Sequence, residues 1–361
     1  MSPPARLAKG DAVLRSLTVR NFTVFEEADL RFVKGLNVIL GENGTGKTHL
    51  LKLPYAVMAT SAEEGRKSAE RPTKAVLRTR LAEKMVNIFR PEDRLGRLAR
   101  RQPGRSRCEI AIKFTRNDAS IGFTFASQNR SEVVVDRLPL QWHDKPPVFL
   151  PTRELLTIYP GFVALYDTHH LEFDETWRDT CQLLGAPTLK GPRQAKVAGL
   201  LDPLEEQLGG RVTERHGRFY LGPFGASSME MPLVAEGWRK LAMLARLIAT
   251  GSLLDRGCLF WDEPESNLNP RLIREVAKAI LGICRAGVQV FVATHSLFLL
   301  REFEVLLEHE FEDVRHRYFA LERDNGDVRI SQAGKIEDVD PLAMLDEELR
   351  QSDRFVQTFM P

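Results

Sequence analysis

A loop suited to binding phosphates occurs at residues 41–48. Its sequence, Gly-Glu-Asn-Gly-Thr-Gly-Lys-Thr, fits the pattern G-x-x-x-x-G-K-[ST]. In such a loop, backbone N–H groups and the N-terminus of the next helix surround phosphate groups, the lysine reaches the terminal ones, and the last hydroxyl binds Mg²⁺. The pattern predicts a nucleotide site with Thr48 also acting as a metal ligand, and the predicted nucleotide contacts are Asn43, Gly44, Thr45, Gly46, Lys47 and Thr48.

A pair of acidic residues follows an apolar run farther along the chain. Residues 258–261 read Cys-Leu-Phe-Trp, as is typical of a buried strand, and Asp262 and Glu263 come next. Beside bound phosphates, one carboxylate can hold Mg²⁺ through water while its neighbour polarises the attacking water. We therefore predict that Asp262 is a metal ligand and that Glu263 is the catalytic base. Since a bare acidic pair is often only a solvated turn, this prediction depends on the residues that follow.

The residues after this pair resemble a known family. Residues 264–270 read Pro-Glu-Ser-Asn-Leu-Asn-Pro, and the apolar run 288–293 is followed by Thr-His-Ser. In this order, the segments resemble the Walker B motif, the D-loop and the switch histidine of ABC-type ATPases, including the SMC, RecF and OLD relatives. The resemblance implies that the cofactors are ATP and Mg²⁺. It also implies that His295 is a catalytic residue that contacts the γ-phosphate and that Asn269 contacts the nucleotide.

Residues 234–240 stand where this family has its signature motif, which one subunit donates across a dimer to the nucleotide of the other. They read Val-Ala-Glu-Gly-Trp-Arg-Lys, and Ala235 replaces the family's serine, whose hydroxyl binds the γ-phosphate. A helix that begins near Gly237 would still offer N–H groups and a positive dipole end. The resemblance therefore implies that Ala235, Glu236 and Gly237 contact the nucleotide of a second subunit. The alternative is a plain buried helix that starts at Glu236.

Two other family positions are matched in less detail. Residues 17–25 resemble the opening strand of the SMC and RecF group, and this resemblance puts Asn21 at the nucleotide. The family's glutamine loop follows a strand, but the chain has no glutamine directly after the apolar run 148–150. Glu154 could take that position and serve the metal through a bound water. The alternative is that Glu154 is the first acid of a helix.

The elements that must hold these motifs alternate along the chain. Strands alternating with helices predict a sheet that is covered on both faces. We expect an α/β fold of the ABC-ATPase type of P-loop NTPase, with a mixed central sheet, helices on both faces and a helical signature lobe. Pro54 should kink or end the helix that begins near Gly46. The expected strands are 36–40, 148–150, 258–261 and 288–293. The expected helices are 74–100, with a break at Pro91, then 171–208, 237–248, 270–284 and one after Ser296. The expected hairpins are 108–125, 212–221 and one that turns at 324–326.

Three regions are expected within this fold. The first ATPase lobe spans 12–150 and carries a basic helical insertion at about 66–107. A helical lobe with the signature-like loop spans 151–250, and residues 251–361 complete the first lobe.

The composition of the chain excludes several classes of protein. With 361 residues, 43% hydrophobic and 28% charged, it is globular rather than fibrous or disordered. No run approaches the roughly 20 apolar residues of a membrane helix, and the first residues lack a signal-peptide pattern, so we expect a cytoplasmic protein without a membrane partner. The four cysteines are scattered and form no metal-binding or disulfide pattern.

The charge is unevenly distributed along the chain. Residues 66–107 contain fourteen Lys and Arg against four Asp and Glu, whereas the residues after Arg301 contain sixteen acidic and seven basic ones. Such segments contact different partners, or each other. The basic segment is a candidate for nucleic-acid contact, with a solvated face or a protein-docking surface as alternatives.

Three functions fit the resemblance. Transporter subunits have a cleaner signature motif, so a transporter is not expected. Asp262 follows Thr48 by only 214 positions, and no heptads occur between them, so a coiled-coil arm is not expected either. The 66 residues after His295 are too few for the nuclease domain of OLD proteins. We expect a slow ATPase core standing alone, which dimerises around ATP and controls a separately encoded effector in anti-phage defence. The alternatives are a RecF-like DNA-repair ATPase and an ATP-gated scaffold with negligible turnover.

Overall fold

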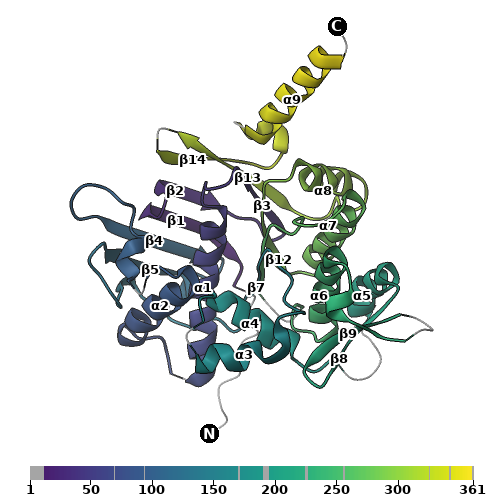
Figure 1. The fold of residues 1–361 in the computed structure, drawn as a ribbon. Coiled ribbons are helices and arrows are strands. Elements are labelled where there is room, and N and C mark those ends of the chain that lie inside the picture. Colours follow the sequence, from purple (N-terminus) through teal and green to yellow (C-terminus); the bar gives the residue numbers. More distant parts are fainter. Residues whose placement is uncertain are drawn as a thin grey trace.

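A six-stranded mixed sheet forms the centre of the fold in the computed structural model (Figure 1). The structure describes residues 12–68, 70–92, 94–169, 171–189, 195–223, 227–254, 257–324, 326–340 and 343–359. The strand order is β14 (Asp327–Ala333), β13 (His316–Asp324), β3 (Leu36–Gly41), β12 (Gln289–Thr294), β11 (Cys258–Asp262) and β7 (Val148–Leu150). All neighbours are parallel except β13 and β14, which are antiparallel. The predicted mixed sheet is therefore confirmed.

Both faces of this sheet are buried, as its nearly continuous apolar strands require. Along β3, Leu36, Val38 and Leu40 belong to one apolar core and Ile39 belongs to the other. The helices that contribute to the first core include α6 (Glu236–Ala249), α7 (Pro270–Arg285) and α8 (Leu297–His309), and those of the second core include α1 (Lys47–Lys67) and α2 (Lys74–Phe89). Helices thus cover both faces, as predicted.

A second, antiparallel sheet closes the other core. Its strand order is β2 (Phe25–Arg31), β1 (Leu14–Phe22), β4 (Arg107–Phe114), β5 (Ile121–Ala126) and β6 (Val134–Arg137). Strands β4 and β5 form the hairpin predicted at 108–125, whereas β6 was not predicted. Since α1 shares one core with this sheet and with β3, it is enclosed from both sides.

The helix that follows the phosphate loop is longer than the sequence predicts. Helix α1 continues through Pro54 to Lys67, so the predicted early end at Pro54 is wrong. A proline removes one backbone hydrogen bond, but residues 55–62 are all buried, and their packing holds the helix together. Helix α2 ends at Phe89 and is capped by Arg90 (φ 54°), directly before the predicted break at Pro91.

The helical region is divided more finely than predicted. Instead of one helix over 171–208, the chain forms α4 (Glu175–Leu184) and α5 (Ala195–Leu208), and residues 190–194 lie outside the described residues. Helix α3 (Tyr159–Thr168) was not predicted, because Pro160 and Gly161 interrupt its pattern. The predicted hairpin at 212–221 is present as β8 (Gly210–Arg215) and β9 (Arg218–Pro223), which β10 (Met229–Glu230) joins in a three-stranded sheet.

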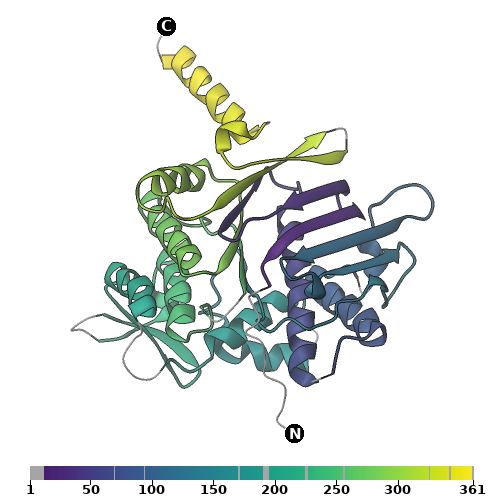
Figure 2. The ribbon, with the colours of Figure 1, turned by 180° about the vertical axis from the view of Figure 1, so that it is seen from behind.

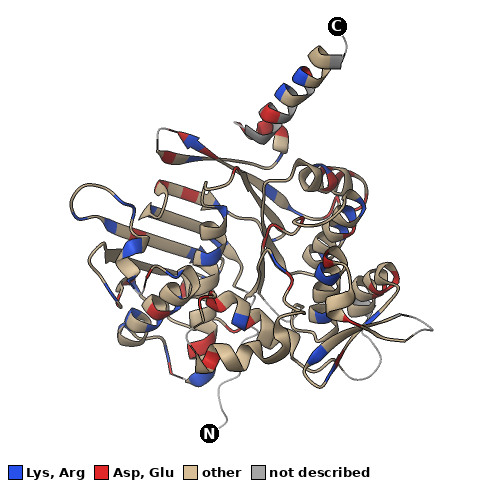
Figure 3. Ribbon diagram, viewed as in Figure 1, with Lys and Arg blue, Asp and Glu red and all other residues tan. Residues whose placement is uncertain are grey.

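The chain ends in a hairpin and a projecting helix. Strands β13 and β14 form the predicted hairpin, although residue 325 of its turn lies outside the described residues. Helix α9 (Ala343–Phe359) extends away from the body in Figures 1 and 2 and carries both signs of charge in Figure 3. Among the described residues, no helix has the length and apolarity needed to span a membrane.

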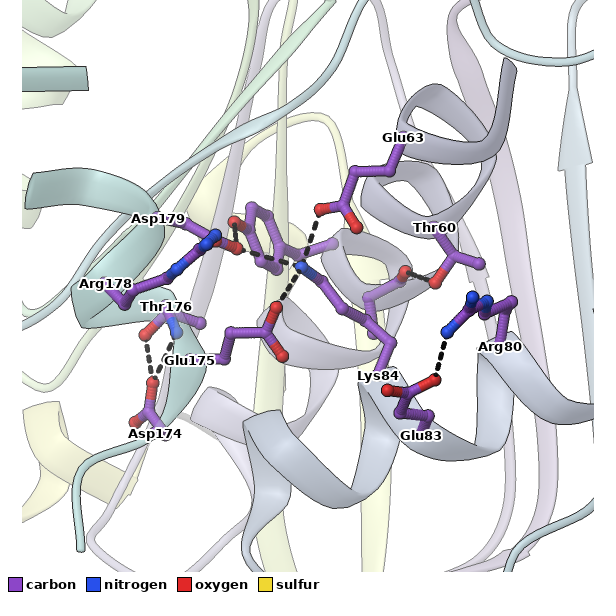
Figure 4. Close-up of polar contacts among 12 residues, drawn as sticks. Thr60, Glu63, Arg80, Glu83, Lys84, Asp174, Glu175, Thr176, Arg178 and Asp179 are labelled. Atoms are coloured by element: carbon purple, nitrogen blue, oxygen red, sulfur yellow. Dashed lines mark hydrogen bonds and ion pairs between the residues drawn. The ribbon is translucent and has the colours of Figure 1, made fainter. Parts of the chain in front are cut away.

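A buried lysine joins three helices (Figure 4). The Lys84 Nζ of α2 lies 2.7 Å from Glu63 of α1, and 2.8 and 3.1 Å from Glu175 and Asp179 of α4. Burial opposes the charge of Lys84, but the three carboxylates outweigh it and raise its pKa. The Tyr55 hydroxyl of α1 donates to Asp179 at 2.7 Å. These carboxylates are close enough together to hold a metal ion, but the amine of Lys84 already occupies the space between them.

Replacing Lys84 should destabilise the fold strongly. Lys84→Met removes the cation that three clustered carboxylates share, and breaking such a buried pair costs about 3–5 kcal/mol. Arg80→Met is the matched control on the same helix, because Arg80 is half exposed and pairs with Glu83 at the surface, where such a pair is worth roughly 0–1 kcal/mol. Urea unfolding measures both losses. Equal losses would mean that the cluster does not stabilise the fold.

Candidate nucleotide-binding site

The phosphate loop connects the centre of the sheet to α1. Strand β3 ends at Gly41 and α1 begins at Lys47, the arrangement predicted from the sequence. Gly44 and Gly46 have φ values of 80° and 89°, a backbone conformation that residues other than glycine rarely adopt. A Cβ at Gly46 would also lie 2.7 Å from Val24. Glycine is therefore required at residue 46 both by the backbone and by the space available.

Lys47 lies inside the curve of this loop. Its Nζ donates to the carbonyl oxygens of Gly41 at 2.7 Å and Glu42 at 2.9 Å, and the residue is buried. Burial lowers the pKa of Lys47, against the opposing effect of four carboxylates, of which Glu263 and Asp262 act most strongly. The hydrogen bonds of this cation go to loop carbonyls, which a bound phosphate could replace.

The predicted metal ligands meet at the edge of the sheet. The Thr48 hydroxyl donates to Asp262 Oδ2 at 2.9 Å, although the two residues are 214 positions apart. Burial raises the pKa of Asp262 to about 6, and the bond from Thr48 opposes this shift. In the described part of the chain, the buried Oδ1 of Asp262 has no hydrogen-bond partner. An unpartnered carboxylate oxygen beside a hydroxyl suits Mg²⁺, which prefers oxygen ligands.

The predicted catalytic pair is also in contact. His295 Nδ1 lies 3.1 Å from Glu263 Oε1, and Ser266 Oγ donates to Glu263 Oε2 at 3.1 Å. Glu263 itself has a left-handed backbone, with φ at 47°. A non-glycine residue in this region is strained, and such strain is concentrated at functional sites. The turn therefore directs the Glu263 carboxylate toward the histidine.

A third carboxylate at this edge was not predicted. Glu265 is buried, accepts a hydrogen bond from the Thr294 hydroxyl and lies 4.0 Å from His295 Nδ1. Burial raises its pKa, and its Oε2 has no hydrogen-bond partner in the described residues. The Pro-Glu-Ser run contained the residue, but only the fold shows that its side chain turns inward.

The signature-like loop begins α6 beside the D-loop of the same chain. Ala235 and Glu236 are exposed, and Glu236 accepts a hydrogen bond from Asn267 Nδ2 at 2.9 Å. A Cβ at Gly237 would lie 3.1 Å from Leu272 and 3.2 Å from Leu268. Packing within one subunit therefore accounts for this glycine. The contact of the loop with a second nucleotide remains a prediction.

Glu154 has partners within its own chain. It accepts hydrogen bonds from the N–H groups of Leu156 and Thr157, and it forms a buried ion pair with Arg239 of α6 at 3.1 Å. Both of its carboxylate oxygens are engaged in this way. Glu154 lies in the loop before α3, which begins at Tyr159, so it is not the first acid of a helix. Its role at the metal remains a prediction.

Two more predicted nucleotide contacts also have local partners. The Asn269 side chain accepts the N–H of Leu272 and caps α7. Asn21 Nδ2 donates to the carbonyl oxygen of Arg107 at 3.1 Å. Both asparagines shape the loops around the site, and their contact with nucleotide remains a prediction.

A basic cavity of about 710 Å³ adjoins the phosphate loop. Arg323 donates to the carbonyl oxygen of Gly44 at 2.9 Å, and Arg100 forms an ion pair with Asp327. Arg100 is only 18% exposed, so it is a wall of this cavity rather than a free surface cation. The basic segment and the acidic C-terminal segment thus meet here. The lining includes Thr23, Val24, His49, Arg90, Arg97, Arg100, Arg101, Arg323 and Asp327.

Comparisons with known proteins match two parts of the chain to family models. Residues 16–133 match "AAA domain", and residues 143–301 match "AAA domain, putative AbiEii toxin, Type IV TA system". The chain is also similar to the DNA replication and repair protein RecF of Streptococcus gordonii (38% identity) and Streptococcus suis (40%). Each of these similarities covers 53 residues, or 15% of this chain and 15% of the relative.

The fold is similar to solved SMC heads. A structure of the SmcHead bound to the C-winged helix domain of ScpA has a TM-score of 0.54 at 13% identity, over 90% of this chain and 98% of that chain. A Smc head domain with an extended coiled coil, bound to the C-terminal domain of ScpA derived from Pyrococcus furiosus, has a TM-score of 0.50 at 13% identity, over 94% and 99%. These likenesses support the fold class.

The family follows from these observations together. The phosphate loop, the Walker B carboxylates and the switch histidine lie at one edge of a sheet whose architecture is that of an SMC head. The two AAA-domain matches cover both halves of that arrangement. The chain belongs to the ABC-type P-loop ATPases of the SMC, RecF and OLD kind.

Proposed function

We propose that this protein binds ATP with Mg²⁺, hydrolyses it slowly, and dimerises around it. The observation that carries the proposal is the pair of contacts Thr48–Asp262 and Glu263–His295 at one sheet edge. The contacts join the metal ligands to the catalytic pair although the residues come from separate segments of the chain. Such an arrangement supplies what phosphoryl transfer needs, namely phosphate positioning, charge stabilisation and an oriented water.

Each of these side chains has a defined part in the proposed reaction. Lys47 leaves the loop carbonyls and donates to the terminal phosphates of ATP. Thr48 and Asp262 would hold Mg²⁺, which when bound neutralises charge on the phosphates. Glu263 accepts a proton from the attacking water, and His295 steadies the γ-phosphate and the Glu263 carboxylate.

The basic cavity is the proposed place of the nucleoside. It adjoins the loop at Gly44, and Val24 and His49 offer it apolar and aromatic surface. Burial lowers the pKa of His49 to about 4, so its ring is neutral near pH 7. A neutral ring beside arginines suits a base and its ribose better than it suits another phosphate group.

Exposed apolar side chains support self-association around ATP. Leu233, directly before the signature-like loop, is 70% exposed, and Phe298, three residues after His295, is 56% exposed. Each of these apolar side chains is adjacent in sequence to a loop of the proposed site, where a partner surface would bury it. We propose that a second copy covers this face when ATP is bound, with Ala235, Glu236 and Gly237 at the second nucleotide.

The biological role proposed for this ATPase is control of a separately encoded effector in anti-phage defence. The description of the family model over residues 143–301, which includes a toxin of a toxin–antitoxin system, supports this role. The second candidate is a DNA-repair ATPase, which the RecF similarity favours equally. A scaffold with negligible turnover is the third, supported by Ala235 in place of the signature serine.

Substituting Lys47 and Glu263 should separate ATP binding from hydrolysis. Lys47→Ala removes a cation from the phosphates and should weaken ATP binding roughly 10- to 100-fold. Glu263→Gln should retain binding but slow phosphate release roughly 100-fold or more, because only the proton acceptor is lost. Calorimetry and a phosphate-release assay measure the two effects. Wild-type turnover in Glu263→Gln would exclude Glu263 as the base.

The signature-like loop is best tested at Ala235, since Gly237 packs within its own subunit. In the Glu263→Gln background, Ala235→Arg should leave ATP affinity unchanged and prevent ATP-dependent dimerisation, whereas Ala235→Ser should strengthen it. Ala164→Arg, at an exposed alanine of α3, is the control. Light scattering with and without ATP measures the mass. Normal dimerisation of Ala235→Arg would exclude the proposed head-to-tail pairing.

The DNA-repair alternative makes a prediction about the basic segment. Arg101 and Arg105 are exposed, so changing both to glutamate should weaken DNA binding and reduce its salt dependence without affecting ATP binding. The control changes Arg215 and Arg218, two exposed arginines of the β8–β9 hairpin. Fluorescence anisotropy with duplex DNA over a range of salt concentrations decides. Equal affinity of both double variants and the wild type would exclude the basic segment as a DNA site.

A further inference from the structure

The turn of residues 263–267, called the catalytic turn here because it carries the proposed base Glu263, contacts a buried lysine that the proposed reaction does not use. Lys240 lies one turn inside α6 and is only 2% exposed. Its Nζ donates to the carbonyl oxygens of Glu263 at 3.0 Å and Ser266 at 2.8 Å. A buried lysine is costly unless its charge is compensated. Here two carbonyl oxygens of one short turn receive its hydrogen bonds.

The conformation of this turn needs external support. Glu263 and Asn267 both have left-handed backbones, with φ values of 47° and 63°. Strained residues persist only when their surroundings determine them. Ser266 N–H donates to the Glu263 carbonyl oxygen at 3.2 Å, and Glu263 N–H donates to Ala293 of the neighbouring strand at 2.8 Å. The bonds from Lys240 to both ends of the turn complete this support.

The position of the proposed base depends on the same turn. The Glu263 carboxylate accepts from Ser266 Oγ and faces His295 Nδ1, both at 3.1 Å. Because Ser266 is also a Lys240 partner through its carbonyl oxygen, a change in the turn would move the base and its hydroxyl partner together. A small misplacement of a reacting group lowers the rate sharply while leaving binding intact.

We infer that Lys240 is a positioning residue for Glu263 and links the signature helix to the base of its own subunit. The inference rests on the proposed function. Lys240 follows Gly237 by three residues on the rigid helix that presents the signature-like loop. When a second nucleotide engages that loop, any shift of α6 reaches the Glu263 turn through this amine. ATP binding by the same subunit uses the phosphate loop and does not depend on Lys240.

The helix offers a closely matched control for this inference. Arg246 of the same helix is also buried, at 4% exposed, and donates to the carbonyl oxygens of Leu184 and Ala186 at 3.0 and 2.9 Å. These carbonyls lie at the C-terminal end of α4 and outside the catalytic turn. Arg246→Met therefore removes the same kind of bond without touching Glu263. A purely structural role for Lys240 predicts that the two variants behave alike.

The experiment compares steady-state ATP hydrolysis, ATP affinity and thermal unfolding in three variants of the full chain. Lys240→Met, of similar length and without a charge, should lower kcat roughly 10- to 100-fold and leave ATP affinity within about twofold. Lys240→Arg keeps donors and charge and should recover part of the lost kcat. Arg246→Met should lose stability to a similar extent but keep its kcat within about threefold of wild type.

Each outcome has one meaning. Unchanged kcat in Lys240→Met, or an equal loss of kcat in Arg246→Met, would overturn the inference while leaving the proposed ATPase intact. A wild-type protein that binds ATP without turnover would overturn proposed hydrolysis and the inference with it. If Lys240→Met does not fold, Lys240→Gln, which keeps an N–H donor but not the reach of lysine, is judged by the same criteria.

Discussion

The parallel pairing of β3, β12 and β11 is the constraint on which the site depends. In this register Ala293 lies opposite Ile39 and Asp262, so the three strands end at the same edge. The phosphate loop, the switch histidine and the acidic pair each follow one of these ends. Slipping one strand by a single residue would turn its side chains to the other face. The bond from Thr48 to Asp262 therefore requires the correct sheet, and no local preference could create it.

The strained backbone of the catalytic turn is held in place by the elements around the sheet edge. Three of its supports come from different elements, namely the Ala293 carbonyl of β12, the Lys240 amine of α6 and the His295 ring after β12. A left-handed residue costs on the order of 1–3 kcal/mol, which the surrounding packing must offset. The Arg239–Glu154 ion pair attaches the same helix to the loop after β7. Helix α6 thus contacts both loops that border the site.

The sequence predicts the parts of this protein that depend on local patterns. The run 36–40 was identified as a central strand because it is short, apolar and ends at glycine, and the loop that follows has a defined chemistry. The roles of Lys84, Lys240 and Arg100 could not be predicted, because each depends on partners far away in the chain. Of the two outcomes expected at Pro54, a kink or an early end, the early end does not occur, because tertiary packing outweighs one missing hydrogen bond.

The acidic side chains at the sheet edge are only partly compensated by nearby cations. Asp262, Glu263 and Glu265 converge there, and burial raises the pKa of Asp262 and of Glu265. Lys47 and Lys240 are two of the nearby cations, and each donates to backbone carbonyls rather than forming a close ion pair with these acids. Among the residues that the structure describes, one carboxylate oxygen of Asp262 and one of Glu265 therefore have no hydrogen-bond partner. An arrangement that is incompletely compensated on its own would be stabilised by a cation at Asp262, as the proposed Mg²⁺ site requires.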